Sequence, residues 1–233
     1  MLVAGTDGCP AGWICLRRRM KSREIHPQVF INAADLLDQR PRPSVLTIDV
    51  PIGLSDSGAR FCDHAARRVL GARASSVFPA PIRPALSART YGSACRITLE
   101  RTGKQISRQA WAIYPKVREI DRAMIERPSL QGAVHEVHPE VSFWAWNGGV
   151  AIEPPKRTRA GRDARRLLVD SHFGPDSFEL VRHRYRASDV TDEDILDAFA
   201  ALWTAERIAT GTAGTLPDVV PLDTAGLRME IVY

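Results

Sequence analysis

The sequence lacks several features that would assign it to a special class of protein. No apolar run approaches the ~20 residues that a membrane-spanning helix needs. The first residues, MLVAGTDGCPAGW, contain neither the basic segment nor the long apolar stretch of a signal peptide. We find no internal repeat, no low-complexity tract and no phosphate-binding GxxxxGK[ST] motif. These absences predict a cytoplasmic globular protein that does not associate with membranes.

Cysteine is also scarce, with four residues at positions 9, 15, 62 and 95. No two of them form a CxxC pair, and their spacing resembles no zinc knuckle. A disulfide-stapled secreted domain and a structural zinc site are therefore both disfavoured, and we expect reduced thiols.

The composition that remains is ordinary for a soluble domain, but the charge is unevenly distributed. Of the 233 residues, 44% are hydrophobic and 25% are charged, and this length suits a single domain. Residues 57–127 hold fourteen Arg and Lys against five Asp and Glu, whereas residues 128–233 hold eleven against sixteen. A basic middle beside an acidic C-terminal half suits a nucleic-acid partner, although a solvated arginine-rich surface gives the same pattern.

The apolar pattern predicts an α/β fold. Strands are expected at residues 2–7, 12–18 and 24–30, followed by a helix capped by Asn32 and a buried strand at 45–50. Three antiparallel strands, a helix and a parallel strand give the order βββαβ, which is the RNase H-like arrangement of a mixed sheet flanked by helices. We expect residues 1–233 to form one such domain.

A helical insertion interrupts this order at about 56–130. It contains expected helices at 58–70, 87–101 and 107–127, the last bent at Pro115, and an irregular loop at 71–86. After it we expect a strand at 133–138, helices at 140–146, 162–172 and 192–209, and a short edge strand within 219–232.

Two aspartates follow predicted strands directly. Asp7 ends the first strand and precedes Gly8, and Asp49 lies in the apolar run LTIDVPIGL. If the two strands are parallel neighbours, both carboxylates emerge at the strand ends, where α/β sheets bind ligands. Two like charges there call for a cation such as Mg²⁺. A turn role explains Asp7 equally well, but a buried carboxylate is expensive in the run around Asp49.

The helix TDEDILDAFAALWTAERIA carries two more candidates. Asp194 stands three residues after Thr191, so it either caps the helix or joins a site. Asp197 lies inside the helix among apolar residues, where a structural role is harder to find. Both share one stripe with Ala198, Ala201 and Ala205, whose small side chains would let the helix lie close to the sheet.

The stretch HEVHPEVSFW contains Glu136. It is a candidate metal ligand or base, or else the partner of an arginine from the insertion. Zinc is disfavoured, because His135 and His138 would point to opposite faces of a strand and HExxH needs a helix.

Seven motifs, in order along the chain, resemble the predicted RNase H-like nuclease family, a domain-of-unknown-function group: GTDGCPAGW, TIDVPIGL, RFCDHAAR, SSVFPAP, SRQAWAIYPKVREID, EVHPEVSFW and DEDILDAFAALWTA. The last is also similar to the helix of Holliday-junction resolvases, where two aspartates at i and i+3 precede an alanine-rich run. The resemblance implies that Asp7 is the first-strand ligand and that Asp49 or Glu136 is the second.

We therefore expect a Mg²⁺- or Mn²⁺-dependent nuclease. Asp7, Asp49 and Asp197 would hold metal, and Asp194 or Glu136 would complete the catalytic site. The basic insertion would contact phosphate through Arg60, Arg67 and Lys116. Two alternatives remain open: a small-molecule phosphotransferase or phosphohydrolase of the actin-like superfamily, and a non-catalytic binding module.

Overall fold

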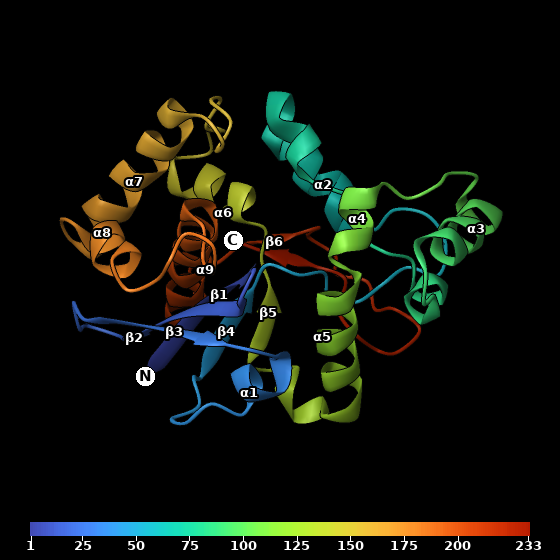
Figure 1. Ribbon diagram of the computed structural model, residues 1–233, viewed down its shortest axis with the longest axis horizontal. Helices are drawn as coiled ribbons and strands as arrows, with labels where there is room; N and C mark the ends of the chain where they lie inside the picture. Colours follow the sequence, from blue (N-terminus) through green and yellow to red (C-terminus); the bar gives the residue numbers. More distant parts are fainter.

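A five-stranded mixed sheet forms the centre of the protein, whose computed structural model describes all 233 residues (Figure 1). Its strands stand in the order β3-β2-β1-β4-β5. The first three pair antiparallel, while β1 with β4 and β4 with β5 pair parallel. Their bounds are β1 Leu2–Cys9, β2 Gly12–Arg19, β3 Ile25–Phe30, β4 Val45–Ile48 and β5 Val134–Glu136. The predicted α/β class, the three antiparallel strands and the parallel fourth strand are confirmed.

One face of the sheet is covered by the long helix α9, Asp192–Thr210 (Figure 1). Helices α6 Pro139–Trp146, α7 Arg159–Phe173 and α8 Ser177–Arg182 pack against α9. The side chains of Leu196, Phe199 and Leu202 are fully buried there. Each contributes about 1.5–3 kcal/mol of burial energy, so packing on the sheet holds this helix in place.

The helix approaches the sheet most closely at Gly5 of β1. A Cβ atom at Gly5 would lie 1.9 Å from the backbone nitrogen of Leu202, so only glycine allows the contact. Next to it, the Thr47 hydroxyl of β4 donates a 2.7 Å hydrogen bond to the carbonyl of Ala201. The alanine stripe of the helix therefore lies against the sheet, as its spacing predicted.

The opposite face carries α1, Ala33–Leu37, and α5, Tyr114–Glu126 (Figure 1). Val117 and Ile120 of α5 pack with Leu46 and Ile48 of β4 in one buried cluster. The expected insertion at 56–130 is thus more than an appendage at one end of the sheet, because its last helix covers a sheet face. Its other helices are α2 Phe61–Leu70, α3 Tyr91–Thr102 and α4 Arg108–Ala112.

Three local expectations are corrected. The helix expected at 107–127 divides into α4 and α5 at Ile113 instead of bending at Pro115, since Pro115 lies in the first turn of α5, where a missing N–H costs nothing. Helix α8 was not expected. The C-terminal strand β7, Ile231–Val232, pairs with β6, Thr215–Leu216, in a separate small sheet.

The structure also bears on membrane-spanning helices and on the cysteines. No helix is both long and apolar enough to cross a bilayer. All four cysteines are free and buried.

Candidate functional site

Asp7 and Asp49 lie where the parallel pairing of β1 with β4 ends. Strand β1 itself continues to Cys9 through its pairing with β2, so the prediction that Asp7 ends its strand is wrong. Thr6 of β1 pairs with Ile48 of β4, so each aspartate follows a paired residue. The Asp49 amide continues this pairing with a 3.1 Å hydrogen bond to the carbonyl of Thr6. By strand alternation Asp7 shares a face with Gly5, the face that α9 covers. Asp7 is 7% exposed and also accepts a 2.7 Å bond from the Gly8 amide.

Asp197 of α9 faces the same region and is 3% exposed. Its Oδ2 accepts a hydrogen bond from the ammonium group of Lys156, whereas its Oδ1 is buried without a partner. We refer to Asp7, Asp49 and Asp197 as the acidic cluster.

The members of the acidic cluster act on one another electrostatically. Burial raises the pKa of Asp7 well above its ordinary value, and the charges of Asp49 and Asp197 add to this effect. Burial, followed by the charge of Asp197, raises the pKa of Asp49 to about 8. The three carboxylates of the cluster therefore carry more negative charge than the groups around them neutralise.

Lys156 is the cation of the acidic cluster, and sequence reasoning missed it. It lies in the loop between α6 and α7 and also reaches to 3.9 Å from Glu193. Burial alone would lower the pKa of Lys156, but the neighbouring Asp197 carboxylate outweighs burial and raises it. In the sequence Lys156 stands in PPKR among other basic residues, and no local pattern distinguishes it.

Glu136 has a different environment from the acidic cluster. Its two carboxylate oxygens accept bonds of 2.7 Å each from the two terminal nitrogens of Arg60, and Oε2 also accepts a 2.6 Å bond from the Ile52 amide. Strand alternation places Glu136 on the same face as Val134, which packs in the cluster opposite α9. Of the two roles left open for Glu136, the structure favours pairing with an arginine of the insertion.

Arg60 is consequently held in pairs within the fold, and the expectation that it contacts substrate stays a prediction. It is 3% exposed, pairs with Asp63 at 2.7 Å as well as with Glu136, and donates to the carbonyls of Ile52 and Gly53. Burial alone would lower the pKa of Arg60, but the Glu136 and Asp63 carboxylates outweigh burial and raise it. Arg60 thus fixes the chain that leaves β4.

Arg67 and Lys116 are likewise engaged elsewhere. The guanidinium of Arg67 donates two bonds, of 3.0 and 2.7 Å, to the carbonyl of Val77. The ammonium of Lys116 bonds to the carbonyl of Gly12 and lies 4.4 Å from the centre of the Trp13 ring. Both side chains brace loops, so the expectation that they contact phosphate is not supported.

Asp194 forms the capping box anticipated as its structural role. Its carboxylate accepts a 2.8 Å bond from the Thr191 amide, and its amide donates a 3.2 Å bond to the Thr191 hydroxyl. Burial raises the pKa of Asp194, against the effect of these hydrogen bonds to Thr191. Asp194 therefore stabilises the start of α9 beside the acidic cluster.

A cavity of about 530 Å³, which we call the central cavity, opens next to the acidic cluster. Asp49 and Lys156 both line it, and so do two arginines that sequence reasoning did not select, Arg73 and Arg157. His138 also lines it, and burial lowers the pKa of this imidazole. The central cavity is therefore bordered by both carboxylate and basic groups.

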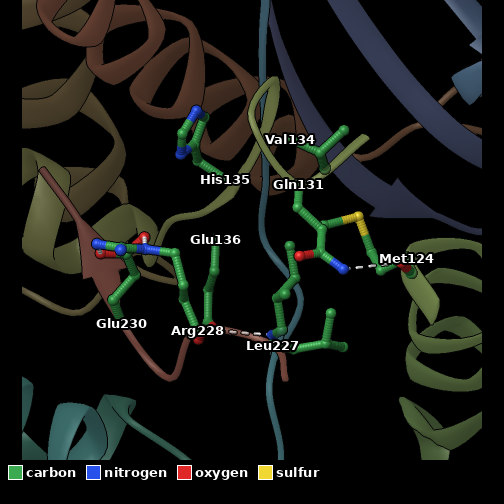
Figure 2. A pocket seen from close by; sticks show the side chains of 9 residues that line it. Met124, Gln131, Val134, His135, Glu136, Leu227, Arg228 and Glu230 are labelled. Atoms are coloured by element: carbon green, nitrogen blue, oxygen red, sulfur yellow. Dashed lines mark hydrogen bonds and ion pairs between the residues drawn. The ribbon is translucent and has the colours of Figure 1, made fainter. Parts of the chain in front are cut away.

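A second cavity, of about 20 Å³, lies behind Glu136 and has room only for water (Figure 2). Figure 2 shows His135 and Glu136 pointing in opposite directions from β5, as strand alternation requires. Arg228 and Glu230, also in this wall, bind one another at 2.7 and 2.8 Å. This small cavity has no unpaired acidic group.

Whether the acidic cluster fits a metal ion can be judged from its atoms. Carboxylate oxygens are the ligands that Mg²⁺ and Mn²⁺ prefer, and the buried, unpartnered Oδ1 of Asp197 is one such oxygen. No three His, Cys, Asp or Glu side chains are arranged as a metal-ligating group, and Lys156 occupies Oδ2 of Asp197. The cluster has the chemistry of a metal site without being arranged as one.

A comparison with known families bears on the whole chain. Residues 5–221 match the family model described as "Protein of unknown function (DUF429)". The chain belongs to this family. No curated protein and no solved structure matches it. The matched DUF429 range contains the acidic cluster, Lys156 and the central cavity, but its description names no activity.

Proposed function

We propose that this protein is a Mg²⁺- or Mn²⁺-dependent nuclease that hydrolyses phosphodiester bonds. The observation that carries the proposal is the acidic cluster itself. Two carboxylates leave adjacent parallel strands on the face that bears a third, and burial raises the pKa of both strand carboxylates. A buried group of like charges is unfavourable unless cations neutralise it, so a bound divalent ion would relieve the repulsion that Lys156 alone leaves.

The topology supports an RNase H-like assignment. The sheet order β3-β2-β1-β4-β5, with three antiparallel strands followed by two parallel ones, is compatible with the βββαβ pattern. Helix α9 lies across β1 and brings Asp197 toward the strand ends. This combination also agrees with the resemblance of α9 to the helix of Holliday-junction resolvases.

In this proposal Asp7, Asp49 and Asp197 would hold the metal. A bound ion supplies charge that activates water and stabilises the leaving oxygen. Of the residues of the chain, Lys156 holds Asp197 in place, Asp194 fixes the start of α9, and Glu136 with Arg60 fixes the loop after Asp49. Arg73 and Arg157 line the central cavity as candidate phosphate contacts. Nucleic acid, or another phosphate-bearing molecule, is the proposed substrate.

The proposal is tested by incubating the protein with Mn²⁺ and single-stranded and duplex DNA and RNA. Asp49→Asn removes one charge of the acidic cluster, and Asp163→Asn, at an exposed site of α7, is the matched control. We expect cleavage by the wild type and the control and a loss of at least about 100-fold in Asp49→Asn, the scale of removing one group from a catalytic site. Absence of cleavage on every substrate, or equal cleavage by Asp49→Asn, would refute the proposal.

A phosphohydrolase or phosphotransferase acting on a small molecule is the second candidate. The volume of the central cavity, about 530 Å³, lies within the usual range of small-ligand sites. Hydrolysis of nucleoside monophosphates, or ATP binding measured by calorimetry, would favour this alternative. If the protein bound neither Mg²⁺ nor Mn²⁺, a non-catalytic binding module on the same fold would become the better description.

A further inference from the structure

One exposed aromatic side chain has no explanation in the fold. Several large apolar residues are exposed, among them Ile31, Phe61 and Val219, and single exposures of this kind are common. Phe78 is the member of this group that lines the central cavity, and it is 45% exposed. Its ring therefore borders the space next to the acidic cluster.

The backbone around Phe78 is held firmly. Val77 is 2% exposed and packs with Leu70 and Val141 in a small core, and its carbonyl accepts both bonds from Arg67. On the other side Pro79 restricts the chain, since proline fixes its own φ. The structure thus anchors the residue before Phe78 in the core while leaving the Phe78 ring exposed at the cavity.

The surroundings of Phe78 suit a nucleotide better than an apolar ligand. Arg73 lies five residues earlier, lines the same cavity and has a buried Nε without a partner. Arg157 and Gln109 also line the cavity, and both are exposed. The cavity combines an aromatic face, an amide that can bond a base edge, and cations that can contact phosphate.

We infer that Phe78 is a stacking platform for one nucleobase of a single-stranded nucleic acid whose phosphate lies toward Asp49. This inference rests on the proposed function and narrows its substrate class. In a duplex both faces of a base are covered by neighbouring bases, so an aromatic ring reaches a base face only in an unpaired strand. Stacking on aromatic side chains is tolerant of sequence, because every base has a π-face.

The test measures binding apart from cleavage. Fluorescence anisotropy in EDTA follows a labelled DNA strand of roughly ten nucleotides, a length within the site sizes of single-strand binding folds. A second strand of equal length carries abasic sites throughout, and a third probe is the duplex. Phe78→Ala is compared with Phe61→Ala, which truncates an exposed phenylalanine outside the central cavity.

We expect Phe78→Ala to weaken binding of the normal strand by roughly 5- to 150-fold, the effect of losing one base stack. Phe61→Ala and Phe78→Trp should bind like the wild type, and the abasic strand should bind equally weakly to the wild type and Phe78→Ala. Equal binding by Phe78→Ala and Phe61→Ala would overturn the inference, as would a wild type that does not bind the normal strand, does not distinguish it from the abasic strand, or binds the duplex as tightly.

This outcome is separable from that of the proposed function. If Phe78→Ala binds normally while Mn²⁺-dependent cleavage still requires Asp49, only the stacking inference fails. If base-dependent binding requires Phe78 but no substrate is cleaved, the nuclease proposal fails and the protein binds single strands without cutting them. Retained melting temperature of Phe78→Ala excludes misfolding as the cause of weak binding.

Discussion

Two groups of buried acidic residues lie close together in this protein and differ in how their charge is neutralised. Glu136 and Glu140 are each 5% exposed, and each receives two hydrogen bonds from a buried arginine. Asp7 and Asp197 are similarly buried, at 7% and 3%, but share one lysine with Asp49. Burial alone does not distinguish the two groups.

The two groups differ in whether each carboxylate has a cation of its own. Arg165 donates bonds of 2.8 and 2.6 Å to Glu140 and is itself fully buried, as Arg60 almost is beside Glu136. In both pairs the arginine bonds to both carboxylate oxygens, so neither oxygen is left without a partner. In the acidic cluster, by contrast, Oδ1 of Asp197 has no partner. A buried acid is therefore a better candidate for function when its charge is incompletely paired.

The largest effect should come from breaking a matched pair. Arg60→Met leaves the carboxylates of Glu136 and Asp63 buried without their cation, so we expect a loss of about 3–5 kcal/mol in the free energy of unfolding. Urea denaturation measures it. Arg122→Met, which breaks an exposed pair with Glu126, is the control and should leave the free energy of unfolding nearly unchanged, because solvent screens such pairs. Equal losses in the two variants would mean that the Arg60 pairs are not structural.

A smaller effect is expected in the acidic cluster. Lys156→Met removes the hydrogen bond to Asp197 and should cost about 1–3 kcal/mol in EDTA, the scale of leaving one buried acceptor unsatisfied. Because the variant lacks the competing ammonium group, we expect it to bind Mn²⁺ more tightly than the wild type in calorimetry. Unchanged stability together with unchanged Mn²⁺ affinity would contradict the assignment of Lys156 as the cation of the cluster.

The smallest effect concerns the pH dependence of stability. The pKa of Asp49 is about 8 in the folded protein, against about 4 in an unfolded chain. Between these values the folded state binds more protons, so stability falls as the pH rises. We expect Asp49→Asn in EDTA to flatten this slope, which between the two pKa values is worth up to about 1.4 kcal/mol for each pH unit. Thermal unfolding from pH 5 to 9 measures it, and an unchanged slope would contradict this interpretation.

Much of the fold could be predicted because its signals are local. The apolar runs of β1 and β2, the Asn32 cap of α1 and the capping box of α9 each lie within a few residues of chain, and the structure contains all of them. Helix α8 escaped prediction, since it is short and the side chain of its N-cap residue, Asp176, makes no capping bond. The insertion was understood only in part, because whether α5 lies on the sheet depends on contacts with β4 that its own periodicity does not identify.

In the candidate site, too, some residues could be recognised from the sequence and others only from the structure. From the sequence, Asp49 and Asp197 already stood out, because an apolar strand and an apolar helix are poor places for unpaired carboxylates, whereas a turn explained Asp7 equally well. Three-dimensional packing was needed to show that Glu136 pairs with Arg60, 76 residues away, and that Asp197 bonds to Lys156, 41 residues away. The physical reason is that Coulombic pairing depends on distance in space, and that distance is set by how α9, β5 and the loops pack, not by the spacing of residues along the chain.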